Sequence, residues 1–222
     1  MTNPTDTSSV LARELTDVPD EVRVAPAPVL PHLAAPFEIR PADPEGPDPD
    51  LLADWMNRPH LVKAWEQPWN AEQRRANLRA QLAGNYSRPC ILSFDFASID
   101  RPDLGRREVI YMEVYRAAKD EIARLYHADP YDVGFHIATA EHELLGRGVI
   151  AQFFFQLVAG IFEAEPRCRR IMADPDHRNV ATRRVVEKYG WPCLGEFDIR
   201  PDRRIMLLTT PRTPEDFPTL RD

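Results

Sequence analysis

The stretch from Val133 to Ala164 constrains the fold of this chain more than any other part of its sequence. From residue 133 to residue 138, large apolar residues alternate with Gly134, His136 and Ala138, and this period of two is typical of a β-strand. A turn over residues 141–148 contains two glycines, and Val149–Ala164 is then apolar on nearly all sides. Such a run predicts a helix buried between layers, so these elements together favour a layered α/β fold.

The apolar run does not predict a membrane span. Gln152, Gln156 and Gly160 interrupt it, and it is shorter than the roughly 20 apolar residues that a bilayer requires.

Capping residues and period-two patterns place the other elements. Asp48 and Pro49 begin a helix that should end near Pro59, and Asn70 with Gln73 forms a capping box for a helix that ends at Gly84. The remaining expected elements are strands over residues 37–40, 91–96, 109–115, 170–173, 193–199 and 204–209, and a helix between Asn179 and Gly190. This order predicts a single α/β domain with a mixed central sheet flanked by helices.

The N-terminal residues differ from the rest of the chain in composition. Residues 1–36 are rich in proline and polar groups, with Pro26, Pro28, Pro31 and Pro36 towards the end. We interpret this segment as an extended N-terminal arm, partly disordered, and residues 37–222 as the folded domain.

Composition excludes several functional classes. The net charge of −7 argues against a nucleic-acid-binding protein, which normally carries a basic surface. The three cysteines are far apart and show no metal-ligand spacing, so we expect neither a disulfide framework nor a bound metal. The first residues do not resemble a signal peptide, and a reduced, cytoplasmic setting is expected.

The glycine turn is the first candidate binding site. Backbone N–H groups at the start of a helix bind phosphate, and glycines let the backbone approach a ligand closely. A pyrophosphate is therefore expected at residues 146–150. The same pattern also fits an ordinary tight turn between a strand and a helix, and the two interpretations carry about equal weight on this pattern alone.

A second motif follows about thirty residues later. Asn179-x-Ala181 and Glu187-Lys-Tyr-Gly-Trp191, taken with the glycine turn, resemble the two signature motifs of the GNAT acyltransferase superfamily. The resemblance implies that an acyl-CoA or acyl carrier protein donor, rather than a permanently bound cofactor, contacts Gly146, Arg147, Gly148, Val149 and Asn179. Glu143 departs from the glutamine or arginine that usually begins the first motif.

Four longer strings are residues 54–60 (DWMNRPH), 111–120 (YMEVYRAAKD), 128–132 (ADPYD) and 169–179 (RRIMADPDHRN). With them the chain resembles lysine N-acyltransferases of mycobactin-type siderophore biosynthesis, over about residues 37–210. This family acylates the ε-nitrogen of lysine or N6-hydroxylysine with a long-chain acyl group. The resemblance implies a catalytic pair, His136 and Asp174, and an acceptor site containing Trp55, Asn57, His60 and Trp65. Trp55 also lies on an expected amphipathic helix, where a place in the core explains it without an acceptor role.

Each proposed catalytic residue also has a structural explanation. His136 has the pKa range of a general base, and small neighbours leave room beside it, yet a buried histidine bonded to a carbonyl group fits the same pattern. Asp174 orients His136 or binds the amine, or else it caps the turn before Pro175. Where many GNAT enzymes carry a tyrosine that protonates the leaving thiolate, this chain has Val186.

The expected reaction is direct acyl transfer in a ternary complex, with a small-molecule amine as acceptor. Two alternatives remain open at this point. One is an acetyl-CoA-dependent N-acetyltransferase acting on an aminoglycoside or polyamine, and the other is a non-catalytic module that binds acyl-CoA or a carrier protein. The sequence does not decide between CoA and carrier-protein donors, nor does it fix the acyl chain length, the order of hydroxylation and acylation, the general acid or the oligomeric state.

Overall fold

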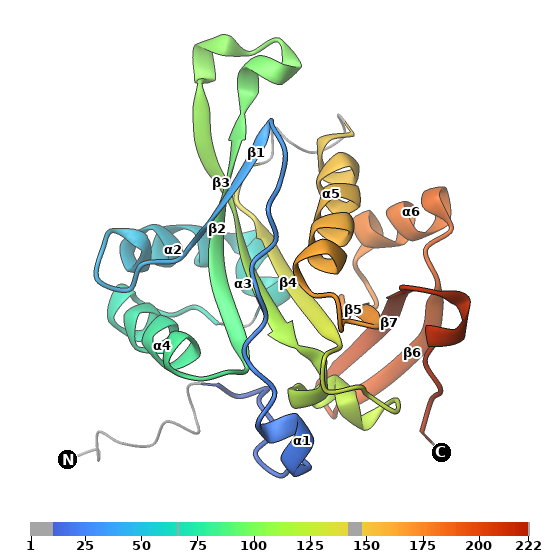
Figure 1. Ribbon diagram of the computed structural model, residues 1–222. Helices are drawn as coiled ribbons and strands as arrows, with labels where there is room; N and C mark the ends of the chain where they lie inside the picture. The colour runs from blue at the N-terminus through green and yellow to red at the C-terminus, as the bar shows by residue number, and fades with distance from the viewer. Residues whose placement is uncertain (1–10, 66, 142–147, 222) are drawn as a thin grey trace, which may run out of the picture.

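A computed structural model describes residues 11–65, 67–141 and 148–221 of the chain. Its centre is one seven-stranded sheet in the order β1-β2-β3-β4-β5-β7-β6 (Figure 1). The strands are β1 Phe37–Pro41, β2 Ser87–Asp95, β3 Arg106–Arg116, β4 Val133–Thr139, β5 Arg170–Ala173, β6 Cys193–Arg200 and β7 Arg203–Pro211. The predicted α/β domain with a mixed sheet is confirmed.

The sheet consists of two antiparallel parts that meet at one parallel junction. Strands β1 to β4 pair antiparallel, and so do β5, β7 and β6. Between them, β4 and β5 run parallel but share only two residue pairs, Val133↔Ile171 and Gly134↔Met172. Beyond Gly134 the two strands are no longer paired, which opens the sheet along the rest of β4.

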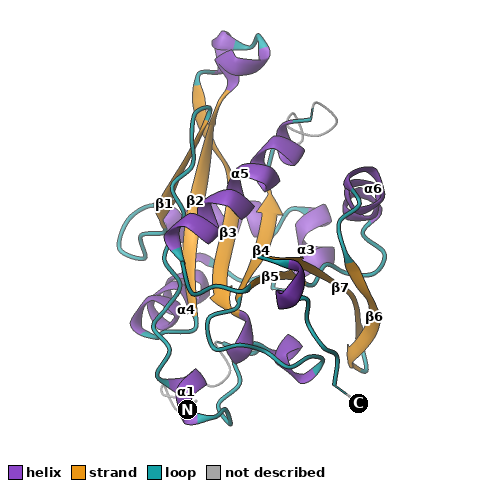
Figure 2. Ribbon diagram, turned by 45° about the vertical axis from the view of Figure 1, so that its right-hand side comes forward, coloured by secondary structure: helices purple, strands orange, loops and turns teal. Residues whose placement is uncertain are grey.

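Alternation along the strands assigns a different set of helices to each face. Cys90 and Leu92 on β2, Met112 on β3 and Phe135 on β4 pack in one core cluster with α5 Val149–Ala164. The intervening residues Ile91, Tyr111 and Ala138 pack on the other face, against α2 Asp48–Met56, α3 Pro59–Trp65 and α4 Ala71–Ala83. His136 has the same strand parity as Ala138, so it faces the side of α2 to α4. Figure 2 shows α5 in front of the sheet and α3 behind it.

The helices begin and end close to the predicted residues wherever the sequence contains capping residues. Helix α5 begins after Gly148, α4 begins with the predicted Asn70–Gln73 capping box, and α6 Val180–Tyr189 lies between its Asn179 and Gly190 caps. The prediction was incomplete at Pro59, because a second helix, α3, begins at that proline instead of the chain becoming irregular. Proline ends a preceding helix and also fits the first turn of the next one.

Short helical turns complete the chain. A four-residue helix, α1 Asp20–Arg23, lies in the arm. The loop between β2 and β3 contains the 3-10 helices Phe96–Ile99 and Pro102–Leu104 and projects from the top of Figure 1. Further 3-10 helices are Ala117–Lys119, Glu121–Arg124 and Pro214–Asp216.

From residue 11 to residue 36, the arm lies along the domain. Arg116 on β3 donates from Nε to the carbonyl oxygen of Pro26 (2.7 Å), and the backbone N–H of Ala34 donates to Gln156 on α5 (2.9 Å). Gly160 on α5 allows this close approach, since a Cβ there would lie 2.8 Å from the carbonyl oxygen of His32. Residues 1–10 are outside the described range.

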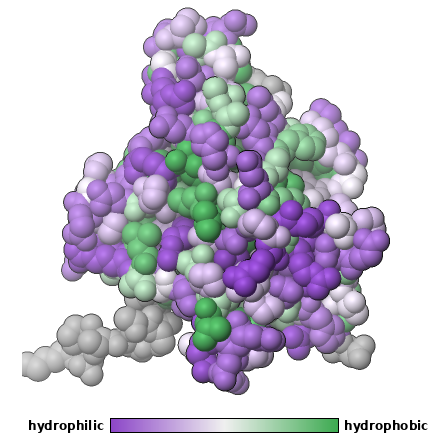
Figure 3. Space-filling model, in the orientation of Figure 1, coloured by the Kyte–Doolittle hydropathy of each residue, from purple (hydrophilic) through white to green (hydrophobic). Residues whose placement is uncertain are grey.

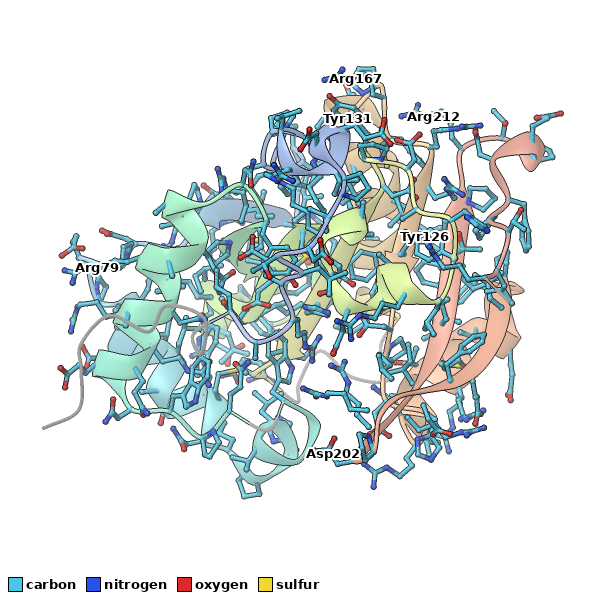
Figure 4. The ribbon with its side chains drawn as sticks, turned by 90° about the horizontal axis from the view of Figure 1, so that it is seen from below. Arg79, Tyr126, Tyr131, Arg167, Asp202 and Arg212 are labelled. Carbon is cyan, nitrogen blue, oxygen red and sulfur yellow. The ribbon has the colours of Figure 1, made fainter. Side chains whose placement is uncertain are left out.

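The ADPYD string over residues 128–132 anchors the entry to β4. The guanidinium of Arg167 lies 3.6 Å from the ring centroid of Tyr131 (Figure 4), and Arg170 pairs with buried Asp132 (3.1 Å). Burial raises the pKa of Asp132 to about 6 despite the lowering effect of Arg170. These contacts hold the start of β4 in place.

Most of the face in Figure 3 is hydrophilic, with smaller apolar patches. Within the described residues, no helix is both long enough and apolar enough to cross a membrane.

Candidate active site

A pocket lies where β4 and β5 are no longer paired. Its walls come from β4, from the residues just after β5, from α5 and α6, and from the N-terminal arm. The lining residues are Arg13, Trp65, Phe135, His136, Ile137, Phe154, Ala173, Asp174, Pro175, Asp176, Asn179, Thr182, Val185, Trp191, Arg203 and Leu208. One end of the pocket is polar and contains His136 and Asp174, the pair that the family resemblance implies.

The imidazole of His136 is held between two carboxylates. In the β3–β4 register Glu113 is the direct partner of His136, and its Oε2 lies 3.4 Å from Nδ1. On the opposite side of the ring, Nε2 lies 3.0 Å from Oδ1 of Asp174. Tyr115 stacks on the imidazole at 4.4 Å between centroids, and Trp65 contacts it edge-on at 6.0 Å. The ring is therefore fixed in orientation, with Nε2 towards the pocket.

Gly134 makes this arrangement possible. A Cβ at this position would lie 2.6 Å from Oη of Tyr115 and still closer to two ring carbons. Without a side chain at 134, the Tyr115 ring crosses β4 and its hydroxyl donates to Oδ1 of Asp174 (2.9 Å).

Asp174 is fully buried and collects three polar partners. Besides His136 and Tyr115, the guanidinium of Arg203 on β7 donates to its Oδ2 (2.8 Å). Burial alone would raise the pKa of Asp174, but His136, Arg203 and Arg13 outweigh it and hold that pKa well below its usual range. Asp174 is therefore a stable carboxylate at neutral pH.

Opposing effects act on His136. Burial and the guanidinium of Arg13 lower the pKa of the imidazole, whereas the carboxylates of Asp174 and Glu113 raise it. The carboxylates have the larger combined effect, so the pKa of His136 lies above its ordinary value. The pKa of Glu113 is lowered despite burial, through its contacts with His136 and Tyr111. A histidine in this setting can accept a proton and keep it stabilised by Asp174.

The donor side of the pocket is only partly described. Gly146 and Arg147 lie outside the described residues, as does Glu143. Gly148 is exposed and adopts φ +79°, the left-handed conformation that suits glycine, and Val149 begins α5 beneath it. Asn179 caps α6 by accepting from the backbone N–H of Thr182 (3.1 Å) while lining the pocket.

An apolar groove adjoins the pocket between α5 and α6. The two share Phe154, Val185 and Trp191. Beyond these the groove is lined by Ala151, Phe155, Val158, Tyr189, Gly190, Pro192 and Thr210.

The four predicted acceptor residues occupy different positions. Trp65 lines the pocket and contacts His136. His60 approaches the end of β4, with Nε2 3.3 Å from the carbonyl oxygen of Thr139. Asn57 donates to the carbonyl oxygens of Ala53 and Trp69 and so ties α2 to the following loop. Trp55 is 3% exposed and packs in the core, so the structure brings Trp65, but not Trp55, to the pocket.

Several polar residues at the site were not among the predicted ones, and those in contact with His136 or Asp174 include Arg13, Glu113, Tyr115 and Arg203. Glu113 and Tyr115 lie in the YMEVYRAAKD string, and their alternation on a strand next to His136 was a usable signal. No residues near Arg13 or Arg203 in the sequence indicate that these two belong to the site. Among the described residues, no group of three or more His, Cys, Asp or Glu side chains is arranged to hold a metal ion.

Comparison with known proteins identifies the family. Residues 45–199 match the model of the acetyltransferase (GNAT) domain. The chain belongs to the GNAT family. It is 52% identical over 213 residues to lysine N-acyltransferase MbtK from Mycobacterium sp. (strain MCS), covering 96% of this chain and 82% of that protein.

Two further comparisons extend this GNAT assignment. The chain is 30% identical over 178 residues to N(6)-hydroxylysine O-acetyltransferase from Escherichia coli, covering 80% of this chain and 53% of that protein. Its fold matches that of aminoglycoside acetyltransferase AAC(6')-Ib in complex with coenzyme A, with a TM-score of 0.63 and 23% identity over 79% of this chain and 95% of that one.

Proposed function

We propose that this GNAT protein transfers an acyl group from a thioester to the ε-nitrogen of lysine or N6-hydroxylysine during the synthesis of a mycobactin-type siderophore. Its 52% identity to a lysine N-acyltransferase over nearly the whole chain supports this acceptor. The observation that carries the proposal is His136, whose Nε2 faces the pocket between β4 and β5 with Asp174 beside it.

The donor would lie along the opening between the strands. The exposed start of α5 at Gly148 provides backbone N–H groups for a pyrophosphate. The unpaired part of β4 leads from there to His136, and the shared apolar residues offer a surface for an acyl chain. The donor is a substrate, acyl-CoA or an acyl carrier protein, and a cytoplasmic location is part of the proposal because these thioesters are made there.

In the proposed reaction the amine attacks the thioester carbonyl directly. An alkylamine is mostly protonated at neutral pH, so the attacking nitrogen must lose a proton. His136 Nε2 accepts that proton and returns it to solvent. The nitrogen loses a second proton as the amide forms, His136 accepts it by the same route, and Asp174 stabilises the imidazolium each time. The new bond joins nitrogen to the acyl carbon, the carbon–sulfur bond breaks, and the thiolate leaves. Because Val186 occupies the usual tyrosine position on α6, solvent protonates the thiolate.

The acceptor end of the pocket is suited to a molecule that carries a basic nitrogen. Asp174 lines the pocket beside His136. Glu113 contacts the other side of the imidazole, Asp120 lies close enough to affect both His136 and Asp174 electrostatically, and Glu121 pairs with Arg13 and Arg203. Carboxylates in a site of low dielectric constant attract an ammonium group strongly. The amine can therefore be drawn in as a cation and deprotonated at His136.

Steady-state kinetics of His136→Gln tests this assignment. Loss of a general base costs about 10²- to 10⁴-fold in rate, so kcat/KM for thiol release should fall by that range. His127→Gln is the matched control, since His127 is exposed and contributes only its backbone N–H to Thr219 among the described contacts. Full activity in His136→Gln would contradict the mechanism.

Varying the donor and the acceptor in the same assay distinguishes the alternative functions. Turnover restricted to acetyl-CoA with an aminoglycoside or polyamine would indicate a small-molecule acetyltransferase, whose fold this chain shares. No thiol release from CoA or carrier-protein thioesters would indicate a binding module.

A further inference from the structure

Arg13 reaches the catalytic pocket from the N-terminal arm. The arm is fixed at this point by two backbone hydrogen bonds, from the N–H of Leu15 to the carbonyl oxygen of Lys119 (2.8 Å) and from the N–H of Glu121 to that of Arg13 (3.0 Å). Nη1 of Arg13 lies 2.5 Å from Nε2 of His136 and 3.6 Å from Oδ2 of Asp174. The side chain is 20% exposed, so it is an ordered wall of the pocket rather than a surface group.

The two neighbours of Nε2 make opposite demands on that nitrogen. A guanidinium group only donates hydrogen bonds, so the contact with Arg13 requires a lone pair on Nε2. An ionised carboxylate only accepts, so the contact with Asp174 at 3.0 Å requires a proton there. Arg13 therefore favours the neutral imidazole with its proton on Nδ1, towards Glu113, and Asp174 favours the imidazolium.

Among the other charges around the ring, the carboxylates favour the imidazolium. Arg203 neutralises Asp174 in part, but it donates to Oδ2, away from the oxygen that faces the imidazole. Arg13 is the cation in direct contact with the ring among the described residues. The charged and titratable groups that face His136 are Glu113 and Tyr115 on β3, Asp120 after β3, Asp174 after β5, Arg203 on β7 and Arg13 in the arm.

We propose that Arg13 is a positioning residue that opposes protonation of His136 and so increases the share of neutral imidazole that can accept the proton of the acceptor amine. The inference rests on the proposed role of His136 as the general base. With Arg13 removed, the two carboxylates would act on the imidazole without this opposing charge, and the neutral fraction that serves as the base would fall without any change to His136. The arm would then be a working part of the active site.

The test is the pH dependence of kcat/KM in Arg13→Gln. A nearby charge shifts a pKa by about 1–3 units, so the acidic limb of the profile should move up by about one pH unit or more. Activity should recover at alkaline pH, where His136 is unprotonated in both proteins. Arg13→Lys keeps the charge and should leave the limb close to its wild-type position.

Arg23→Gln is the matched control. It removes the same charge from the same arm, but Arg23 contacts Asp20 and the carbonyl oxygen of Val18 rather than the pocket. Its profile should coincide with that of the wild type. An unshifted acidic limb in Arg13→Gln, or a loss of activity that is equal at every pH, would overturn the proposal.

NMR titration of the histidine side chains separates this inference from the proposed function. The signal of His136 is assigned by its absence from His136→Asn, and its pKa should rise in Arg13→Gln whether or not lysine is the acceptor. A pKa for His136 that is unchanged by the substitution would refute the inference even if the enzyme acylates lysine.

Discussion

Replacing Gly134 with alanine tests the packing on which the pocket depends. The new methyl carbon would lie 2.6 Å from Oη of Tyr115 and closer still to two carbons of its ring. Unbonded carbon atoms pack at about 3.5–4.0 Å, so the ring would have to move by about 1 Å or more. Tyr115 has no exposed surface, and it is stacked on His136 and packed against Tyr86, which leaves little space for that movement.

The expected cost combines two effects. Overpacking a filled core costs about 1–3 kcal/mol. Displacing the ring also weakens the hydrogen bond from Tyr115 to the Asp174 carboxylate, and such bonds to charged groups contribute about 1.5–3 kcal/mol. Gly134→Ala should therefore destabilise the protein by about 2–5 kcal/mol, a large part of the 5–15 kcal/mol that is typical of a folded protein.

Urea unfolding of four proteins tests whether the Tyr115 ring is the source of this loss of stability. They are the wild type, Gly134→Ala, Tyr115→Leu and the double variant, and the coupling energy isolates the contact between the two sites. In the Tyr115→Leu background the ring is absent, so Gly134→Ala should cost less than about 1 kcal/mol. An equal cost in both backgrounds would refute the explanation that the Tyr115 ring is what excludes a side chain at residue 134.

Three further predictions concern charge and reactivity. Asp174→Asn removes a carboxylate that raises the pKa of His136, so the acidic limb of the kcat/KM profile should move to lower pH, and an unmoved limb would contradict this. The same substitution should lower the free energy of unfolding by about 3–5 kcal/mol, because Arg203 loses a buried partner. The pKa of Asp120 is raised to about 6 by burial and by Asp174, so its ionisation opposes folding as the pH rises. In urea titrations, the unfolding free energy of Asp120→Asn relative to wild type should therefore increase by about 1 kcal/mol from pH 5 to pH 8. A difference that stays constant over this range would argue against a raised pKa of Asp120. Of the three cysteines only Cys193 is exposed, so a thiol reagent should modify one thiol in the native protein and three in urea, and rapid modification of all three in the native state would count against the buried positions of the others.

Elements with local signals were predictable from the sequence. Helix α5 has the predicted bounds, because Gly148 ends the turn and the apolar run begins immediately after it. Helix α6 is defined by Asn179 and Gly190, which cap its two ends. Strand β2 is longer than the predicted 91–96 range because it begins at Ser87 and includes Pro89. Pro89 is tolerated near the end of the β1–β2 pairing, where its carbonyl oxygen accepts from the N–H of Ala42.

The site was predictable only in part, because its contacts join distant segments. The alternation along β4 and the family motifs were enough to single out His136 and Asp174. By contrast, Arg13 contacts a residue 123 positions away, and nothing near it in the sequence indicates that contact. Arg203 meets Asp174 through the order β5-β7-β6, which places β7 next to β5. Trp55 shows the converse, since an aromatic residue in a family motif is a core residue here.

The most direct test of the account is identification of the product by mass spectrometry. Lysine and N6-hydroxylysine would each be incubated with the enzyme and with acetyl and long-chain acyl thioesters of CoA and of a carrier protein. We expect a product acylated on the ε-nitrogen, formed from a long-chain thioester with release of one thiol per acyl group and absent with His136→Gln. Thiol release without an Nε-acylated lysine product, or no reaction with any of these donors, would contradict it.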